Sequence, residues 1–342
     1  MNEFNSEFLL NLLDSFAPSG YEDSVRNIIA KTILPYVTSL KIDGIGNLIA
    51  TIGNEKVLLI TAHMDEVGFM ISGIREDGKL RFNQVGGVSP ANLPSKRVLI
   101  GENSVLGVIG STPVHLNKNK ENKIQYSDLM IDIGAENKEE AEKVVSIGDF
   151  VCFETKSDFN PYNQTVTGKA LDNRLGCYIL TELITSETLK NGTFVFTVQE
   201  ETGLRGATAI LENNRFPVGI ALDTTTANDL PGISPENSVC CLGKGAVISF
   251  ADGATVYNRD KIRALTKRLD EKKIPWQTKT KRTGGNEASA IEKRGQGAYA
   301  ISVSTPCRYI HGPLGMVRLN DLKATMDAVA EIVGILEEEK DA

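Results

Sequence analysis

Acidic and histidine side chains follow three apolar segments of this chain, at the points where strands of a sheet would end. His63 and Asp65 come directly after the run VLLITA, Glu200 and Glu201 follow TFVFTVQ, and Asp223 ends PVGIALD. Ligands of open α/β sheets bind at the carboxyl ends of the strands. The spacing therefore predicts that these five side chains meet at one edge of a sheet.

Asp172 and His311 are two further candidates for the same site. Asp172 opens a predicted helix in GKALDNRLG, and His311 follows the predicted strand AYAISVS. Purely structural roles are the alternative, with Asp172 as a helix N-cap and His63 and Asp65 as a buried pair. The recurrence of the pattern after several separate strands favours a shared site.

The adjacent carboxylates of Glu200 and Glu201 are the reason to expect a cation. Like charges at a strand end repel each other unless a bound cation neutralises one of them, although two solvated loop acids remain the alternative. Two imidazoles and three carboxylates form a nitrogen and oxygen ligand set that suits Zn, Co or Mn. Five ligands are too many for one tetrahedral catalytic zinc, but they suffice for two metal ions that share a carboxylate. Glu200 then remains as general base and acid, and Asp65 orients His63.

The elements that must position these residues predict an α/β fold with an insertion. From about residue 67 to 165 the longer pattern gives way to short β-like pieces between turn signals. We expect a discontinuous catalytic domain, residues 1–66 and 166–342, and an inserted β domain, residues 67–165. Apolar periodicity predicts helices at residues 6–15, 22–34, 172–188, 205–213, 258–272 and 319–339. Strands are expected at residues 47–53, 56–65, 193–199, 217–222, 276–280 and 297–304.

Composition and charge narrow the range of partners and locations. The formal net charge of -7 and the pI near 5.3 argue against a nucleic-acid or membrane partner, because either would require a basic face. The N-terminal segment lacks the positive region of a signal peptide, and no apolar stretch reaches membrane-spanning length, so we expect a cytoplasmic protein. The five cysteines show no Cys-x-x-Cys spacing, which predicts buried reduced thiols, with a nucleophilic cysteine as the alternative.

Five motifs together resemble the tetrahedral aminopeptidases, a family that includes glutamyl and deblocking aminopeptidases. The motifs AHMDEVG, KALDNR, QEETGLRGA, ALDTT and RYIHGP occur in the order and at roughly the separations of that family, over nearly the whole chain. The resemblance implies that Asp172 bridges two divalent metal ions, that His63 and Asp223 complete one site, and that Glu201 and His311 complete the other.

The same resemblance implies roles for the remaining parts of the chain. Glu200 would be the general base and acid, with Asp65 orienting the first imidazole. The fold would be a three-layer mixed-sheet peptidase domain with an inserted barrel-like β domain that caps the site and supports self-association into a homo-oligomer, commonly a dodecamer. The expected ions are Zn or Co, with Mn as an alternative, and the expected substrates are short peptides.

Some residues depart from the family pattern or lie outside its motifs. Asn286 and Glu287 replace a usual Thr-Asp pair, and Gly312 stands where Ser is common, so we expect changes in the pocket wall and in the residues behind the ligands. His115 in the insert is expected at the surface or in a turn, with a contact near a neighbouring subunit's metal site as the alternative.

A metal-dependent aminopeptidase that acts through water activated by two metal ions is the function expected from these features. A deacylase or a glycanase with the same site is one alternative, and a non-enzymatic assembly protein that has kept the fold is another. The preferred N-terminal residue and the native metal are left open by the sequence.

Overall fold

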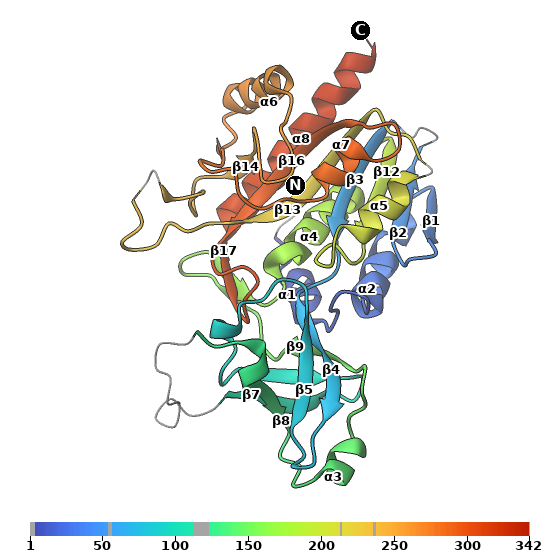
Figure 1. Ribbon diagram of the computed structural model, residues 1–342. Coiled ribbons are helices and arrows are strands. Elements are labelled where there is room, and N and C mark those ends of the chain that lie inside the picture. Colours follow the sequence, from blue (N-terminus) through green and yellow to red (C-terminus); the bar gives the residue numbers. More distant parts are fainter. Residues whose placement is uncertain (1–3, 54–56, 112–122, 213, 235–236, 342) are drawn as a thin grey trace.

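The computed structural model describes residues 4–53, 57–111, 123–212, 214–234 and 237–341. A mixed α/β part with a large central sheet lies at the top of Figure 1, and a small β barrel lies below it. The expected fold class, a mixed-sheet α/β fold with an inserted barrel-like β unit, is confirmed. Within the described residues, no helix combines the length and the apolar character needed to cross a membrane.

The central sheet has eight strands in the order β1-β2-β12-β3-β13-β16-β14-β15. Its four middle strands, β12, β3, β13 and β16, run parallel, while β2 and β14 join them antiparallel. Every residue of β3 and β12 is buried, as expected for parallel strands that are covered on both faces. The bounds of the eight strands are Ser39–Ile42, Leu48–Ile52, Gly192–Thr197, Leu58–His63, Val218–Thr226, Tyr299–Cys307, Ala246–Ile248 and Trp276–Gln277, in sheet order.

Helices cover this sheet, and one of them, α4, carries Asp172. Helix α4 packs on β3 and β13, α8 packs on β16, and the short helix α7 packs on β13 and β16. Helices α1 and α2 pack on α4, and α5 packs on α7. The helices of this part are α1 Ser6–Asp14, α2 Asp23–Ile33, α4 Leu171–Thr185, α5 Arg205–Glu212, α6 Arg259–Glu271, α7 Ala288–Lys293 and α8 Leu319–Asp341.

The barrel closes through six antiparallel strands in the order β4-β5-β8-β7-β6-β9. It has its own apolar core, in which the ring of Phe69 lies 5.1 Å from that of Phe82 and 5.5 Å from that of Phe153, measured between centroids. The buried apolar residues of the barrel thus form a cluster separate from the core around the large sheet. Its elements are β4 Gly68–Ile74, β5 Leu80–Val85, β6 Arg97–Ile100, β7 Val105–Ser111, β8 Leu129–Asp132, α3 Lys138–Glu142 and β9 Phe150–Phe153.

A small three-stranded sheet connects the barrel to the α/β part. Strand β11 (Thr165–Gly168) pairs antiparallel with both β10 (Asp158–Asn160) and β17 (Gly315–Arg318). In this register Gly168 lies opposite Gly315. The segment that leads into α4 and the loop that carries His311 therefore lie side by side.

Most predicted helices and strands are present within one to three residues of their expected bounds. The strand expected at 276–280 covers only Trp276–Gln277, while β14 and α7 were not predicted, because elements of three to six residues show too little periodicity. All five cysteines are free and four of them are buried as predicted, but Cys241 is partly exposed. His115 lies outside the described residues.

Candidate metal centre

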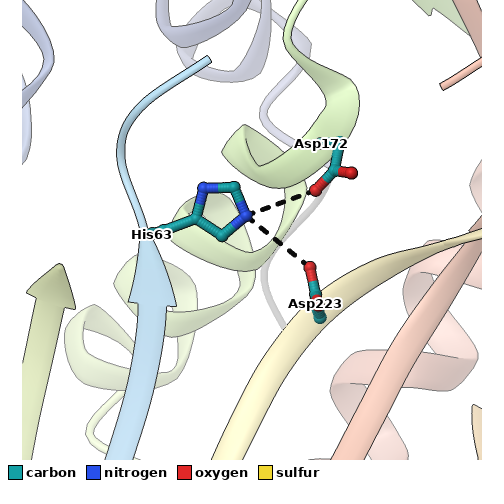
Figure 2. Close-up of side chains that lie close together, drawn as sticks. All are labelled: His63, Asp172 and Asp223. Carbon is teal, nitrogen blue, oxygen red and sulfur yellow. Dashed lines mark ion pairs between the residues drawn. The ribbon is translucent and has the colours of Figure 1, made fainter. Parts of the chain in front are cut away.

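The carboxyl ends of three neighbouring strands bring the first candidates together. His63 ends β3 and lies opposite Thr197, the last residue of β12, in a parallel register. Asp223 lies on β13, which is the other neighbour of β3. Figure 2 shows the carboxylate of Asp223 directed at the imidazole of His63, whose Nε2 lies 3.7 Å from Asp223 Oδ1.

Asp172 lies between the two histidines. Its Oδ1 is 3.3 Å from His63 Nε2, and its Oδ2 is 3.2 Å from His311 Nε2. Near the start of α4, the backbone N–H of Gly176 donates to Asn173 Oδ1 at 3.1 Å, whereas the Asp172 carboxylate faces the two histidines. The alternative interpretation of Asp172 as a helix cap is therefore wrong. Asn173 anchors the start of α4 by donating a hydrogen bond to the carbonyl of Leu222 on β13, at 2.8 Å.

The two adjacent glutamates point to different partners. Glu200 Oε2 lies 3.9 Å from His63 Nε2, whereas Glu201 Oε1 lies 3.2 Å from His311 Nε2. Within the described part of the chain, three groups have ligand atoms that all lie within 4.8 Å of one another: His63, Asp172 and Asp223; His63, Glu200 and Glu201; and Asp172, Glu201 and His311.

The hydrogen bonding of the buried carboxylate oxygens indicates whether these residues fit metal ions. Asp172 Oδ1 and Glu201 Oε1 are buried and lack a hydrogen-bond partner among the described residues, a costly state for a buried carboxylate. Both oxygens face imidazole nitrogens, and oxygen with nitrogen is the donor combination that Zn, Co and Mn accept. The residues present therefore fit divalent metal ions.

The pKa values of the cluster show how strongly its members interact. Burial raises the pKa of Glu201 and Asp223 above the ordinary carboxyl range, and that of Glu200 well above it. Burial also acts on Asp172 in that direction, but contacts with the two histidines outweigh it and lower the Asp172 pKa. Burial opposes a charged His311, yet Asp172 and Glu201 raise its pKa to about 11. Divalent ions would replace the protons that hold these charges together.

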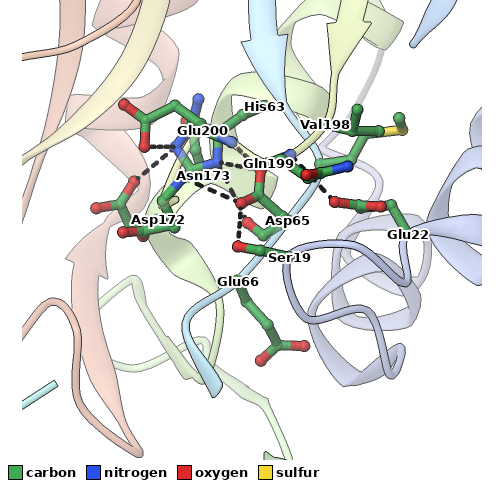
Figure 3. Close-up of polar contacts among 12 residues, drawn as sticks. Ser19, Glu22, His63, Asp65, Glu66, Asp172, Asn173, Val198, Gln199 and Glu200 are labelled. Atoms are coloured by element: carbon green, nitrogen blue, oxygen red, sulfur yellow. Dashed lines mark hydrogen bonds and ion pairs between the residues drawn. The ribbon is translucent and has the colours of Figure 1, made fainter. Parts of the chain in front are cut away.

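Asp65 supports the cluster from behind, as Figure 3 shows. His63 Nδ1 lies 3.4 Å from Asp65 Oδ1 and 3.2 Å from the Asp65 carbonyl oxygen. The Asp65 carboxylate also accepts hydrogen bonds from the backbone N–H groups of Glu200 at 3.0 Å and Glu201 at 3.1 Å, and from the hydroxyl of Ser19. One carboxylate thus contacts both the imidazole and the loop that carries the glutamates.

Glu22 was not predicted to belong to this region. Its Oε1 accepts hydrogen bonds from the backbone N–H of Gln199 at 3.1 Å and of Gly20 at 2.7 Å, so it holds the residue that precedes the two glutamates. Burial raises the Glu22 pKa to about 7. The sequence showed only an acid near a helix start, because the 177-residue separation between Glu22 and Gln199 hides their contact.

Two buried cationic side chains, Arg174 and Lys169, contact the residues that follow His63 at the end of β3. The fully buried guanidinium of Arg174 donates hydrogen bonds to the carbonyls of Met64 and Leu12, both at 2.6 Å. Arg174 and Lys169 both contact the carboxylate of Glu66, at 3.3 and 2.6 Å. Arg174 follows Asp172 by two residues, so the network joins two ligand-bearing segments. The KALDNR motif contained both cations, but only the fold reveals their partner.

Asn286 and Glu287 lie behind the site and do not line its cavity. Asn286 donates a hydrogen bond to the Ser302 hydroxyl at 2.7 Å, and Glu287 is buried beside the hydroxyls of Thr61 and Thr197. Burial raises the Glu287 pKa to about 7. Asn286 and Glu287 thus lie outside the lining of the cavity over the ligand cluster, whereas Gly312 lines a small adjoining pocket together with Asp172 and His311. The changes expected from these departures stay predictions.

A cavity of about 660 Å³ opens over the ligand cluster. This volume falls within the range of about 300–1,000 Å³ that is usual for small-ligand sites. It is lined by His63, Asp172, Glu200, Glu201, Gly203, Asp223, Thr224, Thr225, Thr226, Lys279, Thr283, Gly284, Gly285, Tyr309, Ile310 and His311.

Sequence comparison gives a consistent result over nearly the whole chain. The model of the M42 glutamyl aminopeptidase family matches residues 46–327. The FrvX protein of Escherichia coli strain K12 is 35% identical over 348 residues, which cover 98% of this chain and 97% of that protein. The lysyl aminopeptidase of Pyrococcus furiosus is 30% identical, with 94% of each chain covered.

Solved structures of similar proteins share the fold. The TET aminopeptidase of a marine sediment archaeon of the Thaumarchaeota superposes with a TM-score of 0.91 at 29% identity, covering 95% of this chain and 94% of that chain. The TET1 peptidase of Pyrococcus horikoshii, described as able to assemble into a tetrahedron or a large octahedral shell, gives a TM-score of 0.84 at 33% identity, with 95% and 98% covered.

Proposed function

Because the chain belongs to the M42 glutamyl aminopeptidase family, whose members are metallopeptidases, we propose that it removes N-terminal residues from short peptides with the help of two divalent metal ions. The position of Asp172 carries this proposal. Its two carboxylate oxygens face two different imidazoles at 3.3 and 3.2 Å, as a bridging ligand requires.

Five residues would hold the ions. Asp172 would bridge them, His63 and Asp223 would complete one site, and Glu201 and His311 would complete the other. The ligand set favours Zn or Co, with Mn as an alternative. When bound, such ions polarise the scissile carbonyl and make a water molecule acidic enough to be deprotonated near neutral pH.

Glu200 is the proposed general base and acid. It lies in the cavity next to the ligands, and burial raises its pKa, which brings a carboxyl closer to the range in which it can both take and return a proton. Glu200 takes a proton from the attacking water and donates it to the nitrogen of the leaving amine. Asp65 is a positioning residue that holds the His63 imidazole and the backbone of Glu200 and Glu201.

The negative charge of the cavity supports recognition of a free N-terminus. Carboxylate oxygens that are not bound to metal can accept hydrogen bonds from the α-ammonium group of the substrate, which places the first peptide carbonyl at the ligand cluster. We further propose that the chain is cytoplasmic and forms a homo-oligomer, a dodecamer. Its likeness to two TET1 structures, one described as a dodecamer and the other as able to form a tetrahedron or an octahedral shell, supports the self-association.

Paired chromogenic substrates test the activity. Amino-acid p-nitroanilides and their N-acetylated forms are assayed with protein loaded with Zn, Co or Mn. We expect cleavage of the free-amine substrates alone, because an acetyl group removes the charge that the carboxylates bind. Cleavage of the acetylated forms alone would indicate a deacylase-like enzyme, and cleavage of neither, with glycan hydrolysis, would indicate the glycanase alternative.

A non-enzymatic assembly protein is tested by its metal content. Such a protein would need no ions at this cluster. We expect two divalent ions per subunit in purified, metal-loaded protein, and this metal content would argue against the assembly-protein alternative. Absence of bound metal together with absence of hydrolysis would overturn the proposed function.

A further inference from the structure

The two histidines of the candidate metal centre are held in different ways. Only 3% of the His63 side chain is exposed, and Asp65 contacts its Nδ1, whereas 37% of the His311 side chain is exposed. Within the described residues, His311 Nδ1 has no hydrogen-bond partner, although a metal-bound imidazole is usually oriented by a group that accepts its other N–H. The position of the His311 ring therefore depends on the backbone of its loop.

The loop that carries His311 has an unusual backbone. Tyr309 and His311 have left-handed φ values of 63° and 56°, a region that residues other than glycine seldom adopt. Such a conformation persists only where surrounding contacts hold it. Two backbone hydrogen bonds close the loop, from the N–H of Arg308 to the carbonyl of Met316 at 3.0 Å and in the reverse direction at 3.1 Å. Arg308 is therefore the fixed residue from which the loop departs.

Arg308 forms a bidentate ion pair with Asp229. Its Nε lies 2.7 Å from Asp229 Oδ1, and its Nη2 lies 2.8 Å from Oδ2. Two hydrogen bonds of this kind fix the direction of the guanidinium as well as its distance. Asp229 is itself anchored, because its Oδ2 accepts the backbone N–H of Leu242 at 3.1 Å. Burial opposes the charge of Asp229, but the hydrogen bonds from Arg308 outweigh it and lower the Asp229 pKa, so the pair is charged at neutral pH.

This ion pair joins two segments that carry proposed ligands. Asp229 follows Asp223 by six residues, beyond the end of β13, and Arg308 precedes His311 by three residues, directly after β16. The two strands pair in parallel along their whole length, so the ion pair lies where both chains leave the sheet. Neither Asp229 nor Arg308 lines the cavity over the ligand cluster, which leaves them no contact with a substrate there.

We propose that Asp229, acting through Arg308, is a positioning residue for His311 and thereby controls the affinity of the metal site that His311 shares with Glu201. An ion pair with a purely structural role would stabilise the fold as a whole and would not act on one metal site more than on the other. This inference rests on the proposed function, since it requires the two metal sites proposed above.

Metal titration of an arginine variant provides the test. Protein freed of metal by a chelator is titrated with Zn²⁺ or Co²⁺ in a calorimeter, and bound metal is counted by elemental analysis. Wild type should bind two ions per subunit. Arg308→Met should bind one ion with unchanged affinity and the other about 10- to 100-fold more weakly, the usual cost of losing a residue that orients a ligand.

Further variants of the pair test whether Asp229 and Arg308 act together. Asp229→Asn should weaken the same site, and the double variant with Arg308→Met should be no weaker than the single ones, because each change removes the same contact. Arg308→Lys keeps the charge without the fork of two donors, so it should recover only part of the lost affinity.

Combination with ligand variants identifies the weakened site. Glu201→Gln removes a proposed ligand of the His311 site, so adding Arg308→Met should leave the one remaining ion in place. Asp223→Asn removes a proposed ligand of the other site, so adding Arg308→Met should leave no site with wild-type affinity.

Arg268→Met is the matched control. The side chain of Arg268 is 29% exposed, close to the 27% of Arg308, and it pairs with Glu331 and Glu338 between α6 and α8, outside the cavity lining. This change should leave both metal affinities unchanged. Melting temperatures measured with chelator present compare the metal-free folds, and Arg308→Met should lower this temperature no more than Arg268→Met does.

Two outcomes would overturn the inference while the proposed function stands. The first is wild-type affinity for both ions in Arg308→Met. The second is an equal loss of affinity at both sites together with a lower melting temperature of the metal-free protein, which would indicate a structural role alone. Wild-type protein that binds no divalent ion would instead overturn the proposed function, and this inference with it.

Discussion

The carboxylate of Asp65 accepts a hydrogen bond from the backbone N–H of Glu200, with Oδ1 and N 3.0 Å apart. Its other oxygen accepts the N–H of Glu201 at 3.1 Å, so one side chain at the end of β3 sets the position of the loop beyond β12. The proposed base and a proposed ligand therefore depend on a residue that follows His63 by two positions. This arrangement leads to the first prediction.

Asp65→Asn is expected to lower activity by about 10- to 100-fold, the usual effect of losing a residue that orients metal ligands. An amide keeps one acceptor oxygen, but its NH2 group would face a backbone N–H that needs an acceptor. Steady-state kinetics and metal analysis measure the effect. Ser19→Ala, which removes a single donor to the same carboxylate, is the milder control. Equal activity in Asp65→Asn and wild type would remove Asp65 from its positioning role.

Glu200→Gln and Glu201→Gln separate catalysis from metal binding. Glu200→Gln should lower kcat by at least about 100-fold, because the amide cannot accept the proton of water, while both metals are retained. Glu201→Gln should lose metal from the site that it shares with His311. Turnover and metal content are measured on the same preparations. Unchanged activity in Glu200→Gln would exclude it as the base.

Asp172→Asn is expected to weaken both metal sites, because its two oxygens face both histidines. Bound metal per subunit, measured by elemental analysis, should fall from two ions to one or none. In wild type, removing metal with a chelator should lower the melting temperature, and adding Zn or Co should restore it, because ions that bind the folded state stabilise it. Two ions per subunit in Asp172→Asn would contradict a bridging role.

Glu22 should make stability depend on pH. Its folded pKa of about 7 lies above the ordinary glutamate pKa of 4.5, so its favourable contribution is complete below pH 4.5 and is lost as pH rises through 7. Glu22→Gln keeps an acceptor oxygen for Gln199 and Gly20 but carries no charge. It should therefore be more stable than wild type at pH 8, by up to about 3 kcal/mol, and the difference should vanish towards pH 4.5.

Thermal unfolding across this pH range, with chelator present to keep metal occupancy constant, measures the Glu22 effect. A difference in melting temperature that is the same at pH 5 and pH 8 would show that burial does not perturb this carboxyl.

Local sequence patterns predicted much of the large domain and the candidate ligands. Apolar runs that end in polar groups marked the ends of β3, β12 and β13, because a buried parallel strand requires continuous apolar residues and its carboxyl end reaches the ligand-binding edge. The interpretation of Asp172 as a helix cap failed for a physical reason. Its carboxylate faces the two histidines, and the backbone N–H of Gly176 near the start of α4 is bound by Asn173 instead.

By itself, the sequence determined the α/β class with its β insert and the family, and it supplied the candidate metal ligands, because residue types and local periodicity can be read directly from the chain. Only the tertiary structure decided that Asp65 and Glu22 hold the Glu200 loop, that Arg174 is buried beside Glu66, and that Asp229 pairs with Arg308 next to the His311 loop. Strand order and helix packing create those contacts between segments far apart in sequence, and no periodic pattern along the chain records them.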